Sequence, residues 1–325
     1  MKLLITGGCG FIGSNFVRFW RDKYPFDSIE VIDKLTYAGH RENIKNVKNI
    51  KIHIGDICNN NPIERVAKNK DVIVHFAAES HVDRSISVPD DFIKTNIIGT
   101  HNLLKVALKM KIKLFHHVST DEVFGSLPLK GNEKFSESSI YNPHSPYSAS
   151  KASSDHLVRA YYETYGLPIT ISNTSNNFGP YQDPEKLIPR IVTNLILGKK
   201  VPLMGKGENV RDWIYVEDHC SAIDLIIHSG LKDKKIIGET FCIGANEEKS
   251  NLEIAIDILK HFSKGKNWIE YIPHRLGHDL RYAIDASKIK RVLDWRPKYS
   301  FDEYLSKTIE WYKQNITWWE KYKIN

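Results

Sequence analysis

Short apolar runs alternate with longer amphipathic segments over the first half of the chain. The apolar runs are at most seven residues long, are rich in Val and Ile, and end at Gly, Asp, Ser or Asn, as strands do. They lie at residues 2–6, 28–33, 51–55, 71–77, 113–119 and 168–173. The amphipathic segments, at 13–24, 61–69, 92–110 and 145–166, have helical spacing. This alternation predicts an α/β fold with a doubly wound parallel sheet.

The pattern loosens after about residue 175. Residues 175–189 and 199–218 are rich in Pro, Gly and Asn, and residues 273–285 are irregular. Further helices are predicted at 219–229, 251–262 and 301–315, and a strand at 239–244. We therefore expect a first domain over residues 1–175, rejoined by segments near 215–245. A smaller mixed α/β domain over 176–325 would pack on it and supply loops to a shared cleft.

Composition and charge exclude several classes of protein. The apolar start of the chain is too short for a signal peptide, and no later stretch is long enough to span a membrane, so we expect a cytoplasmic protein without a membrane partner. The four cysteines are scattered, which argues against a disulfide framework or a metal site. The net charge of +7 comes from lysines spread along the chain and not from one basic block. It therefore predicts no nucleic-acid partner, although it favours an anionic substrate.

A glycine-rich turn separates the first strand from the first helix. Gly7, Gly10 and Gly13 would allow a tight turn and a close approach of pyrophosphate to the helix N-terminus. Asp33 ends the second strand, where an acid accepts hydrogen bonds from the adenosine ribose and repels a 2′-phosphate. Asp56, after the third strand, is placed to touch adenine. The pattern predicts NAD as cofactor; the alternative is that Asp33 merely caps the next turn.

Two further groups of residues could carry chemistry. Tyr147 and Lys151 are four apart in a predicted helix and so share a face, where the ammonium would favour a phenolate base. Asp121 and Glu122 follow Thr120 at the end of the fifth strand. Two adjacent carboxylates in a closed site acquire separated pKa values, as an acid/base pair requires. The alternative for the two acids is a solvated turn.

These motifs, in this order, resemble those of the extended short-chain dehydrogenase/reductases. The glycine turn, HFAAESHVDRS (75–85), STDEVFG (119–125) and YSASK (147–151) are closest to the nucleotide-sugar 4,6-dehydratases, and among these to the ones acting on dTDP-glucose. The resemblance continues through 173–182, EKLIP (185–189), NVRDWIYVEDHC (209–220) and GHDLRYAID (277–285) to the last helix. It covers nearly the whole chain.

The resemblance implies a reaction and a role for each catalytic candidate. Thr120 would bind the 4-hydroxyl of the sugar, and Tyr147, aided by Lys151, would take its proton while C4 gives a hydride to NAD. Glu122 would be the base at C5 and protonated Asp121 the acid at O6, so that water leaves before the hydride returns to C6. Three alternatives within the fold stay open: an epimerase, a decarboxylase or a 4,6-dehydratase acting on a UDP-sugar. A non-catalytic NAD-binding sensor would have no reason to keep these residues together.

The resemblance also implies a full set of contacts. Those with the cofactor are Gly7, Gly10, Phe11, Ile12, Gly13, Asp33, Lys34, Thr36, Asp56, Ile57, Phe76, Ala77, Ala78, Thr95, Tyr147, Lys151 and Asn177. Those with the nucleotide sugar are Ser80, Thr120, Asn176, Lys186, Leu187, Pro202, Met204, Arg211, Asn246, Arg275 and His278. Family members are typically homodimers joined by a four-helix bundle, which the helices over 92–110 and 146–165 would form here.

Three positions depart from the family pattern. Asn173 stands where Arg is common, Met204 where Tyr is common, and Leu276 where Pro is frequent. Met204 bears on the identity of the base, because a flexible thioether fixes a ring less tightly than an aromatic side chain does.

Overall fold

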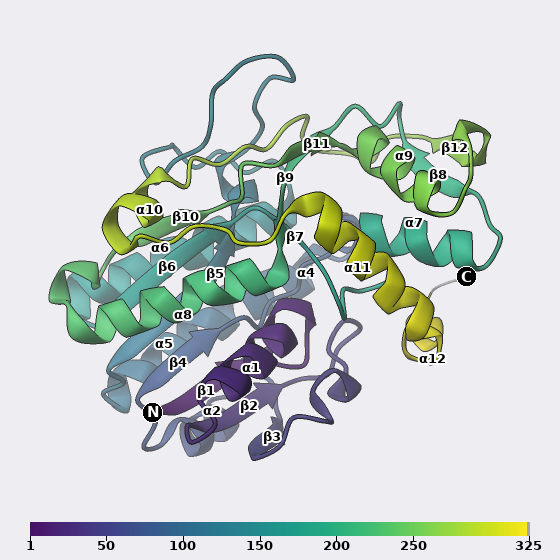
Figure 1. Cartoon of the computed structure of the whole chain (residues 1–325). Helices are drawn as coiled ribbons and strands as arrows, with labels where there is room; N and C mark the ends of the chain where they lie inside the picture. The colour runs from purple at the N-terminus through teal and green to yellow at the C-terminus, as the bar shows by residue number, and fades with distance from the viewer. Residues whose placement is uncertain (324–325) are drawn as a thin grey trace.

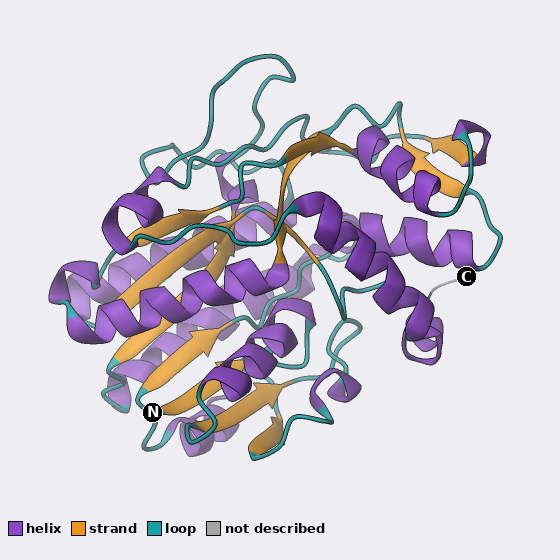
Figure 2. Cartoon of the chain, in the orientation of Figure 1, coloured by secondary structure: helices purple, strands orange, loops and turns teal. Residues whose placement is uncertain are grey.

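The computed structural model describes residues 1–323, and its centre is a seven-stranded parallel sheet (Figures 1 and 2). The strand order is β10-β6-β5-β4-β1-β2-β3. The bounds are β1 Lys2–Thr6, β2 Ser28–Asp33, β3 Ile50–Ile54, β4 Val72–His75, β5 Leu114–Thr120, β6 Ile169–Thr174 and β10 Thr240–Ile243. The chain order reverses between β1 and β4, and a doubly wound sheet opens its ligand crevice at such a point.

Helices cover both faces of this sheet. In Figure 1, α1 (Phe11–Lys23) and α8 (Val216–Lys232) lie in front of it, and α5 (Thr100–Lys109) and α6 (Pro146–Tyr165) lie behind. Adjacent strand residues point to opposite faces. Leu3 and Ile5 accordingly pack in the core with α1 and α8, whereas Leu4 packs with α2 (Asn60–Ala67), α5 and α6. Both faces are apolar because both are buried, so these strands lack a polar side.

The helix α6 has well-defined signals at both ends. Ser145 is its N-cap and forms a reciprocal capping box with Ser148, and Pro146 occupies the first turn, where its missing N–H costs nothing. Gly166 ends the helix at φ 67°, a left-handed conformation that glycine adopts without strain. These caps fix where α6 begins, and therefore place the Tyr147 side chain in its first turn.

The segment predicted as one helix over 92–110 is divided in the structure. The short helices α3 (Val82–Ser87) and α4 (Pro89–Phe92) come first. A π-helical turn, η2 (Ile93–Gly99), follows and leads into α5. A π-helical turn inserts an extra residue and re-aims the side chains around it, and such turns are frequent at functional sites.

A smaller lobe lies beside the sheet, at the upper right of Figure 1, and has its own apolar core. It contains a three-stranded sheet, β11-β9-β7, and a two-stranded one, β12-β8. Its strands are β7 Asn176–Phe178, β8 Val201–Met204, β9 Val210–Tyr215, β11 Glu248–Ser250 and β12 Ile269–Ile272. Its helices are α7 Leu187–Ile196, α9 Asn251–His261, α11 Phe301–Gln314 and α12 Ile316–Trp319. The helix α10 (Ser287–Leu293) packs instead against β10 and α8, at the left of Figure 1.

The predicted fold class is confirmed, and the six strands predicted in the first half are all present within three residues of their expected ends. The strand predicted at 239–244 is β10, which pairs in parallel with β6 and so joins the main sheet. The strands β7, β8, β9, β11 and β12, and the helix α7, were not predicted. They are short or lie in Pro- and Gly-rich sequence, where periodicity is weak.

Across residues 1–323, no helix is both long and apolar enough to cross a membrane. The same residues contain no group of three or more His, Cys, Asp and Glu side chains arranged to hold a metal ion.

Candidate active site

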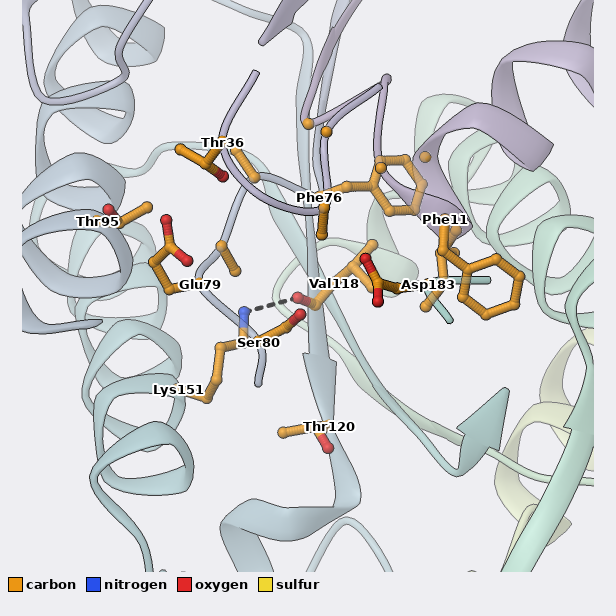
Figure 3. A pocket seen from close by; sticks show the side chains of 18 of the residues that line it. Phe11, Thr36, Phe76, Glu79, Ser80, Thr95, Val118, Thr120, Lys151 and Asp183 are labelled. Atoms are coloured by element: carbon orange, nitrogen blue, oxygen red, sulfur yellow. Dashed lines mark hydrogen bonds between the residues drawn. The ribbon is translucent and has the colours of Figure 1, made fainter. Parts of the chain in front are cut away.

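A cavity of about 290 Å³ opens at the carboxyl ends of the central strands (Figure 3). It runs from the glycine turn after β1, past the ends of β2 and β4, to the end of β5. Each of the residues expected to contact the cofactor lines it, as do Thr120, Asp121 and Glu122. Of the residues expected to contact the sugar nucleotide, Ser80, Thr120, Asn176 and Lys186 line it. The structure thus brings the fingerprint and the catalytic candidates to one cavity.

The glycine turn is shaped as a cradle with little room for side chains. Gly7 has φ +70°, and a Cβ atom there would lie 2.6 Å from the Ala77 nitrogen. A Cβ atom on Gly13 would lie 2.2 Å from the Gly7 oxygen, so the helix could not pack so closely on the strand. A Cβ atom on Gly10 would meet only the Gly7 oxygen, at 3.4 Å. Because Gly10 is also the N-cap of α1 and provides no side-chain cap, the helix N-terminus stays open to a pyrophosphate.

Asp33 is held as a hydrogen-bond acceptor beside this cradle. Its carboxylate oxygens accept hydrogen bonds from the backbone N–H of Cys9, at 2.9 Å, and of Leu35, at 2.8 Å. Burial raises the pKa of Asp33, and these two donors oppose the rise. Asp56 forms an ion pair with Lys34 at 2.9 Å on the same side of the cavity. Carboxylates fixed in this way fit the ribose hydroxyls and the adenine end of NAD.

Tyr147 and Lys151 project from one face of α6 into the cavity, and both are buried. The Lys151 Nζ donates a hydrogen bond to the Val118 carbonyl oxygen of β5, at 2.9 Å (Figure 3). Burial lowers the pKa of Lys151 to about 8. Burial raises the pKa of Tyr147 well above its ordinary value, and the charge of Glu122 raises it further. This direction is opposite to the one expected from Lys151 alone, so the surroundings of Tyr147 favour its neutral phenol.

The two acids stand in a tight turn that begins where β5 ends. Thr120 caps the 3-10 turn η3 (Asp121–Phe124): its Oγ1 accepts a hydrogen bond from the Glu122 N–H, at 3.2 Å. The same hydroxyl donates to Asp121 Oδ1 at 3.3 Å, while Asp121 Oδ2 is buried without a partner. A strand would point neighbouring side chains to opposite faces. Because the chain turns at Thr120, both carboxylates line one cavity.

The surroundings of the two acids differ. Burial raises the pKa of Asp121 well above its ordinary value, and the neighbouring charge of Glu122 raises it further. Burial also raises the pKa of Glu122, but the cations Arg275, Arg211 and Lys186 oppose this rise. Of the two groups, Asp121 is therefore the one that more readily keeps its proton, as an acid must. Glu122 is the one that more readily loses its proton, as a base must.

Seven of the residues expected to contact the sugar nucleotide lie outside the cavity lining: Leu187, Pro202, Met204, Arg211, Asn246, Arg275 and His278. Leu187 starts α7, and Pro202 and Met204 lie on β8. The Arg211 side chain donates to backbone carbonyl oxygens, of Val210 at 2.7 Å and of Asp279 at 3.0 Å.

The other three of these residues contact neighbours in the smaller lobe or at its border. Arg275 faces Asp83 at 3.5 Å. Asn246 accepts a hydrogen bond from Lys134. His278 faces His274 at 3.2 Å. Arg211 and Arg275 still act on the acid pair through their charge, because both oppose the rise in the Glu122 pKa.

Sequence reasoning missed several residues that line the cavity, among them Tyr37, Glu79 and Asp183. The Tyr37 hydroxyl accepts hydrogen bonds from the backbone N–H of Ser80, at 3.3 Å, and of His81, at 3.1 Å. Glu79 and Asp183 point into the cavity in Figure 3. An available signal was their position in the sequence: Tyr37 follows Thr36, Glu79 precedes Ser80, and Asp183 follows the segment 173–182. Their own residue types carry no spacing that would distinguish them from surface acids.

Asn96 in η2 was missed as well, although it does not line the cavity. It exchanges hydrogen bonds with the backbone of Glu79, at 2.9 and 3.0 Å, and donates to Ser150 Oγ at 2.8 Å. The loop after β4 is thereby tied to α6, beside Tyr147.

Comparison with known proteins agrees with this geometry. The family model described as GDP-mannose 4,6 dehydratase matches residues 4–308. The dTDP-glucose 4,6-dehydratase of Mycobacterium tuberculosis strain H37Rv is 46% identical, over 99% of this chain and 96% of that protein. The dTDP-glucose 4,6-dehydratase 1 of Escherichia coli K12 is 45% identical over the same shares.

Solved structures give the same result. DesIV, a dTDP-glucose 4,6-dehydratase from Streptomyces venezuelae solved with NAD bound, superposes with a TM-score of 0.95 at 45% identity, over 99% of this chain and all of that one. A UDP-glucose 4-epimerase from Thermus thermophilus, also solved with NAD, has a TM-score of 0.88 at 26% identity, over 97% of this chain and all of that one. Enzymes that catalyse different reactions therefore share this fold, but the sequence identity of this chain is far higher to the dehydratases than to the epimerase. The chain belongs to the dTDP-glucose 4,6-dehydratase family.

Proposed function

We propose that this protein is an NAD-dependent hydro-lyase that converts dTDP-glucose to dTDP-4-keto-6-deoxyglucose. One observation carries the proposal: two adjacent acids, the buried Asp121 and the half-buried Glu122, line the same cavity as Tyr147 and the glycine cradle. An enzyme that only oxidises or epimerises at C4 needs no such pair. Removal of water across C5 and C6 needs both a base and an acid.

The glycine cradle and Asp33 would hold NAD, which would supply reversible hydride transfer, taking a hydride at C4 and giving it back at C6. The residues of this chain hold the sugar and move its protons. Thr120 orients the 4-hydroxyl, and Tyr147 takes its proton. Burial and the charge of Glu122 both favour the neutral phenol, so the Lys151 ammonium, one helical turn away on the same face of α6, is the group that favours the phenolate.

The 4-keto group makes the C5 proton acidic, and Glu122 removes it. Asp121 gives its proton to O6 as water leaves. The two roles differ because the surroundings of the two acids differ. Asp121 is almost fully buried, and Arg211 is the cation that opposes the rise of its pKa. At Glu122 three cations oppose the rise of the pKa. A second proton transfer returns a proton to C5.

A UDP-sugar is the alternative substrate, for an epimerase, a decarboxylase or a 4,6-dehydratase of the same fold. The likeness to a UDP-glucose 4-epimerase and the replacement of a common Tyr by Met204 keep this alternative open. The acid pair favours dehydration over epimerisation and decarboxylation. A 4,6-dehydratase acting on a UDP-sugar differs from the proposed enzyme only in the nucleobase of its substrate.

The test is to incubate the purified protein with dTDP-, UDP-, CDP- and GDP-glucose and to follow product mass. We expect loss of one water from dTDP-glucose. An isomer of unchanged mass would contradict dehydration and indicate epimerisation. Loss of water from UDP-glucose alone would support dehydration but show that the substrate carries uracil and not thymine.

We further propose that the protein is a cytoplasmic homodimer. All four cysteines are unpaired in the structure, as suits a reducing compartment. Apolar side chains are exposed where the dimer bundle is expected: Ile93 and Ile98 on η2, and Tyr165 at the end of α6. An exposed apolar surface of this kind favours burial against a second copy.

A further inference from the structure

A buried carboxylate, Asp155, lies behind the catalytic end of β5. It stands one helical turn after Lys151 on α6, is fully buried, and does not line the cavity. None of the reaction steps above uses it. Buried carboxylates are rare unless they are paired or hydrogen-bonded, so its role must be sought in what it contacts.

Its contacts hold the end of β5. Asp155 Oδ2 accepts hydrogen bonds from Ser119 Oγ at 2.9 Å, from the Tyr141 hydroxyl at 2.9 Å and from Asn173 Nδ2 at 3.2 Å. Asn173 Nδ2 also donates to the Thr120 carbonyl oxygen, at 3.1 Å. Ser119 and Thr120 are the last residues of β5, directly before the acid pair. The carboxylate therefore fixes the backbone from which the acid pair projects.

The same carboxylate provides the negative charge nearest to Lys151 on the inner side of α6. The other titratable groups facing this region are His75 from β4, His117 from β5, and Tyr141 and Arg159, whose Nη2 donates to the Tyr141 hydroxyl at 3.0 Å. On the cavity side are Tyr147, Asp121 and Glu122.

Neither histidine adds a positive charge near neutral pH. Burial lowers the pKa of His75 well below its ordinary value and that of His117 to about 4. His117 Nε2 lies 3.1 Å from Asp155 Oδ1. Asn173 brings a neutral amide to Asp155. It does not neutralise the carboxylate, whose charge raises the pKa of Lys151 against burial.

We propose that Asp155 is a positioning residue for the dehydration: through Ser119 and Asn173 it fixes Thr120 and the acid pair, and it keeps the Lys151 ammonium charged beside Tyr147. The proposal rests on the proposed function, since it assigns Asp155 a part in that reaction. The carboxylate touches neither substrate nor cofactor, and it acts through the residues that do.

The test is the pH dependence of kcat for Asp155→Asn with dTDP-glucose as substrate. Asparagine keeps the shape and removes the charge, so Lys151 loses its proton at lower pH. We expect the alkaline fall in kcat to begin about one pH unit or more lower than in the unchanged protein. At pH 8 we expect kcat to fall about tenfold, with KM for dTDP-glucose changed less than about twofold.

Two further variants separate positioning from charge. Asn173→Ala removes the link to the Thr120 carbonyl without changing any charge, so kcat should fall while the alkaline limb keeps its position. Ser153→Ala, on the exposed side of α6, removes only a hydrogen bond to the Ala149 carbonyl and should change neither. If Asp155→Asn does not fold, Asn173→Ala alone decides the positioning role, and an unchanged kcat overturns it.

The outcomes also distinguish this proposal from the proposed function. If the unchanged protein does not remove water from any of the nucleotide sugars, the proposed function fails first. If the unchanged protein dehydrates dTDP-glucose and Asp155→Asn keeps both kcat and the alkaline limb, the role of Asp155 is refuted.

Discussion

At the scale of single residues, the site depends on two neighbouring acids in unlike surroundings. Asp121 has a buried oxygen without a partner, and Glu122 is half-buried and faces the cations of the smaller lobe. Neighbours in sequence would usually titrate together in water. Here burial and charge separate them, so one can donate a proton while the other accepts one.

Replacing Glu122 by Gln should stop the reaction at elimination. The amide cannot take the C5 proton, so we expect formation of dehydrated product to fall by at least about a hundredfold. NAD binding should be unchanged, because the cradle and Asp33 are untouched. Product mass and NAD affinity by calorimetry check the two parts. If the variant dehydrates dTDP-glucose at the normal rate, the base at C5 is another residue.

Replacing Asp121 by Asn should stabilise the protein while reducing activity. The pKa of Asp121 in the folded state lies above its ordinary 3.8, so the folded state loses stability as pH rises through and above that value. The amide removes this loss. We expect a higher Tm than that of the unchanged protein at pH 7 to 8, and no difference at about pH 3.5.

The matched control for Asp121→Asn is Glu208→Gln, at an exposed acid. It removes a charge without a burial effect and should leave Tm unchanged at both pH values. A lower Tm for Asp121→Asn at pH 8 would mean that the acid is ionised and stabilised by Arg211 in the folded protein.

At the scale of elements, the three glycines of the turn between β1 and α1 are required for different physical reasons. Gly13→Ala would drive a Cβ atom into the Gly7 oxygen, so we expect a loss of about 3 kcal/mol in the free energy of unfolding. Gly10→Ala has room and a φ of −76°, so stability should change by less than about 1 kcal/mol. Its methyl group would instead reduce NAD affinity by standing where the pyrophosphate approaches. Urea unfolding and NAD titration of both variants check this, and equal stabilities would contradict it.

Elements whose partners are fixed by strong local patterns were predictable from the sequence. The buried strands β1 and β2 were placed at their observed bounds because each is a short run rich in Leu, Ile or Val that ends at a polar residue. The turn η3 was implied by the two acids, which could face one cavity only if β5 ended at Thr120. The strands β8 and β12 were not predictable. They pair with each other across a separation of more than sixty residues, and neither is longer than four.

The same contrast holds for the site. The residues that the resemblance assigns to the cofactor come together in one cavity, because most of them follow the ends of strands that parallel pairing brings to one edge of the sheet. Contacts from the smaller lobe depend on how its loops approach that edge, and Arg211 and Arg275 already bond to the protein itself. Asn96 and Asp155 could not be recognised either. Asn96 contacts the backbone of the loop after β4, and Asp155 contacts side chains of neighbouring elements. Such contacts leave no spacing in the sequence.

At the scale of the whole molecule, one chain supplies each group that the proposed reaction uses, so assembly is not needed to complete the cavity. The turn η2 and the end of α6 nevertheless leave apolar side chains exposed, namely Ile93, Ile98 and Tyr165. With α5 and α6, two such surfaces would pack as a four-helix bundle around a two-fold axis. The proposed dimer would thus cover the outer side of α6, the helix that carries Tyr147 and Lys151.

Ile98→Arg should therefore separate the dimer without disturbing the cavity. A guanidinium in the centre of an apolar interface has no partner, and the cost of burying it exceeds what the remaining contacts provide. Phe26→Arg is the matched control, because Phe26 is fully exposed in the loop between α1 and β2, away from this surface. Size-exclusion chromatography with light scattering should give a dimer for the unchanged protein and for Phe26→Arg, and a monomer for Ile98→Arg. A monomeric unchanged protein, or a dimeric Ile98→Arg variant, would contradict an interface on these helices. Since Ile98 does not line the cavity that holds the NAD cradle, the monomer should still bind NAD.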